Sequence, residues 1–300
     1  MSIKIRYTNK TLVKPSSNTV FFSNEKFNIN SLKKYLSKYE FSYISDLLKS
    51  SDLKKRLLVF EVNSKKKIIL ISIKNNLKTS DIENLGAEFY NLVNHGKNCD
   101  YNIASDSVVG NYENFIGYFL HGTKLKSYEF KKYKTKKETR TISLIISGSK
   151  NNPSTKKQLH FKAIEEGTFY ARDLVSEPGN VLHPDEYAKR LNSLKKDGLK
   201  VNIYDQKKLK KMGMNALLGV GMGSIRGSYL VTMEWNGAKN NSKPVAFVGK
   251  GVTFDTGGYS LKPARFMEDM TYDMAGSAAV VGLMKSLALR KAKINAVGVV

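Results

Sequence analysis

The sequence predicts an α/β protein of two domains, residues 1–150 and 151–300. Strand-like apolar runs alternate with segments of helical periodicity in both halves, which is typical of sheets covered by helices. A length of 300 residues is a prior for two domains and is ample for a buried core. The segment Gly148 to Ser154 (GSKNNPS) is rich in turn-forming residues and poor in apolar ones, so we expect the linker there.

The first half has the elements of a largely parallel sheet. Two β-rich runs, Arg56 to Val62 and Lys67 to Lys74, flank a Lys-rich turn. Ser80 to Gly96 has helical periodicity, and we expect a second helix over about Asn111 to Leu120. Thr141 to Ser147 (TISLIIS) has the composition of a buried strand.

The second half predicts another sheet with helices. A long helix over Lys156 to Val175 should end at the turn Glu177-Pro178-Gly179-Asn180, and His183-Pro184-Asp185 should start the next helix. We expect a further helix from about Asp273 to Arg290. The expected strands are Lys200 to Tyr204, Tyr229 to Trp235, Val245 to Val248 and a last one begun by Ile294 to Val300, and Ala216 to Val220 is a further apolar stretch. Because a domain seldom ends on an unpaired core strand, we expect this chain to be a truncated form of a longer protein.

The chain is strongly basic, with a formal net charge of +24. The excess is spread out, at +14 in residues 1–150 and +10 in residues 151–300. Its densest tract, Lys131 to Arg140, has no aromatic-stacking or glycine-rich motif beside it. We therefore expect a solvated, lysine-rich surface, and nucleic-acid binding stays open as the alternative.

Cysteine and histidine usage limits the redox setting and the kinds of metal site. The lone Cys99 cannot form an internal disulfide, and no signal peptide or membrane-spanning run is evident, so we expect a soluble cytoplasmic protein. The four histidines are scattered, which argues against a Cys/His zinc site. Any metal must therefore use carboxylates or less usual ligands.

The most informative stretch runs from Val248 to Ala279. A strand ends in Gly249-Lys250-Gly251 and Asp255-Thr256-Gly257-Gly258 follows, which places a lysine and a carboxylate at the edge where open α/β sheets bind ligands. Lys250 lacks the spacing of a phosphate-binding P-loop. Asp255 could instead cap a turn, and Asp273 could be the N-cap of the next helix.

These residues resemble the leucyl aminopeptidase (cytosol aminopeptidase) family. The likeness rests on GKGVTFDTGGYSLKP from Gly249 to Pro263 and on Met270-Thr271-Tyr272-Asp273-Met274-Ala275-Gly276. Similar segments lie at Ala171 to Pro184, Gly213 to Ser224, Glu234 to Gly237 and Ser127 to Lys134. The resemblance is strong from about residue 110 onward and weak before it. It implies a macro-domain-like α/β fold for residues 1–150 and a metallopeptidase domain with a mixed sheet, here incomplete, for residues 151–300.

The resemblance implies a two-metal exopeptidase that removes N-terminal residues, preferably leucine, from peptides. Two divalent ions are expected, Zn²⁺ or Mn²⁺, with Mg²⁺ also accepted. Lys250 matches a lysine ligand of one ion, Asp255 a carboxylate that bridges both, and Asp273 a second carboxylate on the lysine-bound ion. A lysine can bind a metal only as the neutral amine, so a nearby dication must lower its pKa.

The same resemblance implies how catalysis would proceed. The metal pair would activate a water and polarise the scissile carbonyl. Lys262 matches the catalytic lysine, whose ammonium faces the developing oxyanion, although alone it would be an ordinary surface lysine. Met270 matches a residue of the pocket for the N-terminal side chain, although a lone Met would more often be core. The predicted substrate-binding residues are therefore Lys250, Asp255, Lys262, Met270 and Asp273.

Part of the family motif is absent from the 300 residues. It would supply an Asp, a bridging Glu and an Arg that holds a bicarbonate, and neither Glu268 nor Asp269 has the spacing to replace them. We expect a protein of these residues alone to be inactive or impaired and the full-length protein to be an aminopeptidase. The alternatives are a non-catalytic binding protein with a basic surface and a degraded product without function. The family also implies homohexamers.

Overall fold

The computed structural model describes all residues except 1, 11–16, 96–98, 136–140, 239 and 241. The end of the predicted helix at Gly96 and the last five residues of the basic tract lie outside the described residues. The chain divides into two compact units, Met1–Gln158 and Leu159–Val300. The division falls within helix α4 (Thr155–Ser176), a few residues after the predicted linker.

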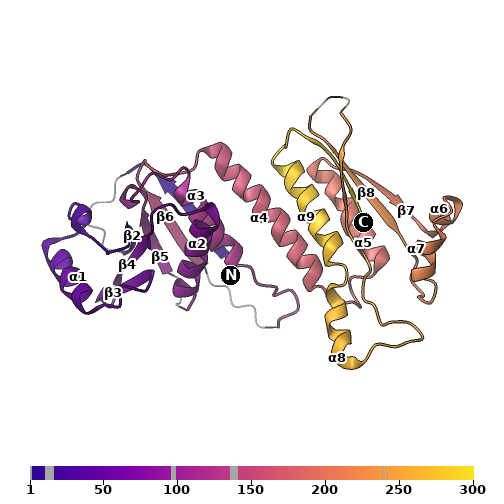
Figure 1. Ribbon diagram of the computed structural model, residues 1–300, viewed down its shortest axis with the longest axis horizontal. Coiled ribbons are helices and arrows are strands. Elements are labelled where there is room, and N and C mark those ends of the chain that lie inside the picture. Colours follow the sequence, from indigo (N-terminus) through magenta and orange to yellow (C-terminus); the bar gives the residue numbers. More distant parts are fainter. Residues whose placement is uncertain (1, 11–16, 96–98, 136–140, 239, 241) are drawn as a thin grey trace. The chain divides into compact units, whose positions relative to one another are not determined.

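The first unit is built on a six-stranded sheet of order β1-β6-β5-β2-β4-β3 (Figure 1). Its strands are β1 (Ser2–Thr8), β2 (Asn18–Asn24), β3 (Leu57–Asn63), β4 (Lys66–Ile73), β5 (Cys99–Ala104) and β6 (Thr141–Ser147). All neighbours are parallel except β3 and β4, the two strands around the predicted Lys-rich turn. The prediction of a largely parallel sheet is confirmed.

Helices α1 (Lys38–Ser50), α2 (Thr79–Val93) and α3 (Phe115–Lys126) complete this unit, with short 3₁₀ turns at Asn30–Leu32 and Ser105–Ser107. Successive residues of a strand point to opposite faces of the sheet, so the side chains of β2 pack into two apolar clusters, one on each face. Val20 and Phe22 join the cluster formed with α2 and α3, and Phe21 joins a second cluster near α1. Burial on both faces explains the nearly continuous apolar run of β4.

Helix α3 begins later than the sequence predicts. Asn114, the residue before it, has a left-handed backbone (φ +56°), so a helix starting at Asn111 cannot run through this position. Helices α2 and α3 also pack at glycines, because a methyl group on Gly86 would lie 1.9 Å from the Phe119 carbonyl oxygen. The close approach fixes α2 against α3.

The second unit has a mixed four-stranded sheet of order β7-β8-β10-β9. Strands β7 (Lys200–Tyr204), β8 (Leu230–Asn236) and β10 (Asn295–Val299) are antiparallel neighbours, and β9 (Val245–Val248) runs parallel to β10. The helices are α4, α5 (Pro184–Asn192), α6 (Gln206–Lys211), α7 (Asn215–Val220), α8 (Ala264–Met267) and α9 (Ala275–Leu289), with 3₁₀ segments at Ser193–Asp197 and Glu268–Tyr272. The predicted α/β class with a mixed sheet is confirmed.

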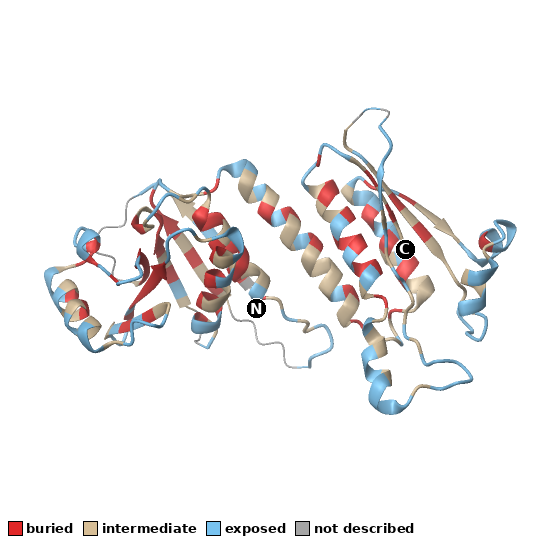
Figure 2. Cartoon of the chain, viewed as in Figure 1, coloured by how far each residue is buried: buried red, intermediate tan, exposed pale blue. Residues whose placement is uncertain are grey.

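Strand β10 lies inside this sheet with β8 on one side and β9 on the other, so the expectation that this last strand is unpaired is wrong. Helix α9 covers it closely, because a methyl group on Gly298 would lie 2.7 Å from Met284 Cγ. In Figure 2, buried residues recur along α9, whereas α8 and the loop before it are mostly exposed. The exposed part is the segment that carries the predicted site.

Among the described residues, no helix combines the length and the hydropathy that crossing a bilayer requires.

Candidate functional site

Three segments of the second unit meet where β9 and β10 end. The two strands are parallel, so their carboxyl ends lie at one edge of the sheet. The Gly249 amide donates to the Val299 carbonyl (2.9 Å), and the Ser277 amide, in the first turn of α9, donates to the Lys250 carbonyl (2.9 Å). A methyl group on Gly249 would lie 2.6 Å from the Gly276 carbonyl oxygen, so glycine permits this approach.

Lys250 and Asp273 form an ion pair across this edge. Lys250 Nζ lies 2.7 Å from Asp273 Oδ1, and the lysine side chain is 60% exposed whereas that of Asp273 is 15% exposed. The second oxygen, Asp273 Oδ2, is buried, and no described group donates a hydrogen bond to it. A buried carboxylate oxygen without a partner is costly, which makes this atom the most unusual feature of the edge.

Asp255 is held by its own turn and by Lys262. The Gly257 amide donates to Asp255 Oδ1 (2.8 Å), and Lys262 Nζ donates to Oδ2 (2.7 Å). The hydrogen bond from Lys262, followed by that from Gly257, holds the pKa of this carboxyl below its usual value, and the charge of Lys250 adds to the effect. The turn needs glycine, because Gly257 has φ +92° and a methyl group there would lie 2.4 Å from the Ser260 carbonyl oxygen.

Met270 completes this second group, since Lys262 Nζ also lies 2.9 Å from its sulfur. The five predicted residues thus form two contact groups, Lys250 with Asp273 and Asp255 with Lys262 and Met270.

The two capping alternatives, a turn cap at Asp255 and a helix N-cap at Asp273, have opposite outcomes. Asp255 does cap its turn, whereas the N-cap prediction for Asp273 is wrong, because α9 begins at Ala275 with Met274 as its N-cap.

The donor set fits a divalent cation in part. Each of the two carboxylates has a lysine ammonium where a cation could bind, and Asp273 Oδ2 is a buried acceptor with no hydrogen bond. Within the described part of the chain, no three His, Cys, Asp or Glu side chains gather into a metal site. A site here therefore requires Lys250 as a neutral amine or ligands beyond these residues.

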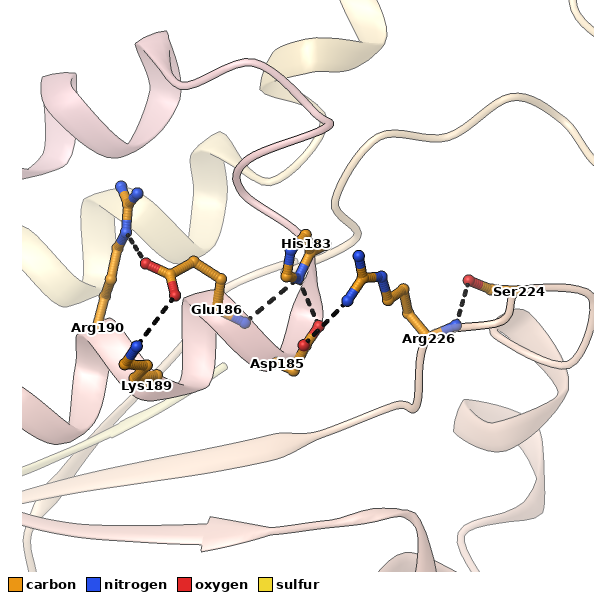
Figure 3. A network of polar contacts seen from close by, with 7 residues as sticks. All are labelled: His183, Asp185, Glu186, Lys189, Arg190, Ser224 and Arg226. Atoms are coloured by element: carbon orange, nitrogen blue, oxygen red, sulfur yellow. Dashed lines mark hydrogen bonds and ion pairs between the residues drawn. The ribbon is translucent and has the colours of Figure 1, made fainter. Parts of the chain in front are cut away.

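A polar network that the sequence analysis did not predict lies at the start of α5 (Figure 3). His183 Nδ1 lies 2.5 Å from Asp185 Oδ1, and Arg226 donates to Asp185 Oδ2 (3.3 Å). These contacts tie the start of α5 to the loop before β8. The only sequence signal was the Pro184 helix start, which places His183 at the N-cap.

The first unit has a cavity of about 280 Å³ between the start of α2, the loop before α3 and Lys157. It contains none of the predicted site residues.

Comparisons with known proteins agree with the second unit's motifs. Residues 169–300 match the family described as "Cytosol aminopeptidase family, catalytic domain". The probable cytosol aminopeptidase of Chelativorans sp. (strain BNC1) is 52% identical over 184 residues, which are 60% of this chain and 37% of that protein. The chain spans less than half the length of the curated relatives it matches.

Solved structures share the fold over nearly the whole chain. A mutant of tomato leucine aminopeptidase has a TM-score of 0.75 at 21% identity and covers 99% of this chain, which covers 62% of that one. The bottromycin maturation enzyme BotP in complex with Mn has a TM-score of 0.73 at 19% identity, with coverages of 95% and 59%. The resemblance to the leucyl aminopeptidase family is confirmed, and the alternative of a non-catalytic binding protein finds no support.

Proposed function

Because residues 169–300 match the catalytic domain of the cytosol aminopeptidase family, we propose that the edge at β9 and β10 is part of a metal-dependent aminopeptidase site. The substrates would be peptides, from which the N-terminal residue is removed. The observation that carries the proposal is the partly buried Asp273 carboxylate, paired with Lys250 through one oxygen and without a hydrogen bond at the other.

Lys250, Asp255 and Asp273 would hold two divalent ions, Zn²⁺ or Mn²⁺, and the solved BotP complex contains Mn. Such ions lower the pKa of a bound water toward about 7 and polarise the scissile carbonyl. Asp255 can act as an anionic ligand at neutral pH, because the ordinary carboxyl pKa of 3.8 already lies well below 7 and its contacts lower the pKa further. Lys250 must lose both its proton and its ion pair with Asp273 before its amine can bind a metal.

Lys262 would not bind a metal ion; its proposed role is to donate hydrogen bonds. It already faces Asp255 and Met270, so it can donate a hydrogen bond beside the ligand carboxylate. There it would stabilise the oxyanion that forms when the peptide carbonyl is attacked. The thioether of Met270 would offer an apolar wall to a side chain such as leucine. Bicarbonate and a hexameric assembly stay predictions from the resemblance, and a cytoplasmic location stays a prediction from the cysteine usage and the N-terminal sequence.

The first experiment is a calorimetric titration of the chain with Mn²⁺. Removing the charge of Asp273 with Asp273→Asn, or of Asp255 with Asp255→Asn, should weaken binding by about tenfold or more, because each loses an anionic ligand. Asp269→Asn is the matched control, since Asp269 is exposed in the same segment and should leave the affinity unchanged. Equal affinities for all four proteins would contradict the proposed ligands.

The second experiment tests the reaction. The chain is extended with the segment that follows the matched region in the Chelativorans relative, and hydrolysis of leucine p-nitroanilide is measured with Mn²⁺ present. Turnover that is lost in Lys262→Met with metal binding retained would support the role of Lys262. Metal binding without any turnover in the extended protein would contradict the aminopeptidase proposal.

A further inference from the structure

Gly179 lies in the turn after α4 and touches the segment that carries Asp255. A methyl group on Gly179 would lie 2.6 Å from Phe254 Cβ, 2.9 Å from Cγ and 3.0 Å from Cδ2. Non-bonded carbon atoms approach to about 3.5–4.0 Å at their optimum, so a side chain at position 179 has no room. Phe254 is the residue immediately before Asp255.

The turn that carries Gly179 is fixed at both ends. Glu177 is buried and pairs with Arg190 (3.0 Å), and the amides of Val181 and Leu182 both donate to the Pro178 carbonyl (2.9 Å each). After Leu182, itself buried, the network of His183, Asp185 and Arg226 holds the start of α5 (Figure 3). The turn therefore cannot retreat from Phe254 without breaking several interactions.

Phe254 cannot escape by rotating its ring. The nearest atom is its Cβ, which stays in place when χ1 changes, so only the main chain at 254 can move. Such a movement would carry Asp255 with it and disturb the contacts that Asp255 makes with Gly257 and Lys262.

We propose that Gly179 is a positioning residue for Asp255: its bare Cα lets the turn after α4 support Phe254 and so fixes the carboxylate at the sheet edge. The proposal that Gly179 positions Asp255 needs only the contacts above, whereas its consequence for metal binding rests on the proposed function.

The test compares Gly179→Ala with Gly219→Ala, because a methyl group on Gly219 in α7 meets no atom within 4 Å. The first readout is the amide resonance of Gly257, which reports the hydrogen bond to Asp255 whether or not a metal binds. Gly179→Ala should shift this resonance and Gly219→Ala should not. The second readout is the Mn²⁺ affinity, which should fall about tenfold in Gly179→Ala, as for other positioning residues of metal ligands.

A double variant separates this steric effect from a general loss of structure. Phe254→Gly in the Gly179→Ala background removes the Cβ that the new methyl group strikes, so it should move the Gly257 resonance back toward its original position. It should also restore folding if Gly179→Ala alone fails to fold.

An unmoved Gly257 resonance in Gly179→Ala would overturn the proposal, and so would a double variant as impaired as the single one. If the resonance moves and is restored but the original protein binds no Mn²⁺, the positioning role stands and the proposed metal site fails.

Discussion

Each of the two carboxylates of the candidate site forms an ion pair with a lysine. Family resemblance could identify Lys250, Asp255, Lys262 and Asp273, because their spacing is a sequence property. It could not reveal which lysine pairs with which carboxylate, since this depends on how the segment before α8 folds over the sheet edge. Nor could it reveal the contact of Gly179 with Phe254, which joins positions 75 residues apart.

The contacts of Asp255 predict that removing Lys262 changes its pKa more than removing Lys250 does. Lys262→Met should raise the pKa of Asp255 toward its ordinary value of 3.8, because the hydrogen bond that most favours the carboxylate is lost. Lys250→Met should raise it less, because Lys250 contributes only through its charge. A carbon-13 NMR titration of the Asp255 carboxyl measures both changes, and a pKa that is equal in all three proteins would refute this assignment.

The buried ion pair of Lys66 and Glu40 predicts a loss of stability in acid. Burial raises the pKa of Glu40, but hydrogen bonds from Lys66 and from the Ser37 amide and hydroxyl outweigh it and lower the pKa below its ordinary value of 4.5. As the pH falls, Glu40 is therefore protonated in the unfolded chain before it is protonated in the folded protein. The stabilisation is present above pH 4.5 and should be lost as the pH falls through the lower pKa of the folded protein.

Urea denaturation across this range checks the pH dependence and the pair itself. Lys66→Met should cost about 3–5 kcal/mol at neutral pH, because it leaves a buried carboxylate without its cation. Lys67→Met is the control, since its pair with Glu61 is exposed and should contribute about 1 kcal/mol or less. Equal costs for the two variants would show that burial of the Lys66 pair has no special effect.

At the scale of elements, helices α4 and α9 cross at two glycines. A methyl group on Gly167 would lie 2.0 Å from Ser286 Oγ and 2.4 Å from the Gly282 carbonyl oxygen. The Ser286 hydroxyl itself donates a hydrogen bond to that carbonyl (2.8 Å), so the side chain has little freedom to move. The crossing fixes α9 against α4, and the first turn of α9 holds Lys250 through the hydrogen bond from the Ser277 amide to the Lys250 carbonyl.

Gly167→Ala should therefore destabilise the second unit by about 1–3 kcal/mol through overpacking, although alanine favours a helix. Thermal denaturation measures the change. Gly219→Ala makes the same substitution in a helix with open space and should be neutral or stabilising by about 0.5–1 kcal/mol. A Gly167→Ala protein as stable as the control would mean that the two helices can separate at no cost.

The sequence predicts elements best where their apolar runs are short and flanked by turn-forming or charged residues. The bounds of β6, β7 and β9 agree with the sequence pattern to the residue. Strands β1, β2 and β5 and helix α1 were not predicted. Strand β1 is an edge strand whose apolar residues alternate with charged ones, and α1 is rich in aromatic residues that also suit strands. Its one clear signal was the capping box of Ser37 and Glu40.

At the scale of the whole molecule, each unit has its own sheet and its own core. All six strands of the first sheet end by Ser147, before α4 begins. Among the residues that the structure describes, the apolar clusters of the first unit contain none beyond Ile146, and that of the second contains none before Tyr170. We therefore propose that the two domains of the sequence prediction fold independently.

A polypeptide of residues 1–153 should then unfold cooperatively on its own, because every residue of its two described clusters is included. Circular dichroism during urea denaturation, combined with a dispersed amide NMR spectrum, tests this expectation. A spectrum typical of an unfolded chain would show that the first unit needs the second for its stability.

The central claim is that Lys250, Asp255 and Asp273 exchange their ion pairs for divalent ions. The most direct measurement is a crystal structure with saturating Mn²⁺, using anomalous scattering to locate the metal. We expect anomalous peaks in contact with both carboxylates, with Lys250 Nζ as a ligand and Lys262 still beside Met270. Crystals in which both lysines keep their carboxylates, with no peak at the sheet edge, would contradict it.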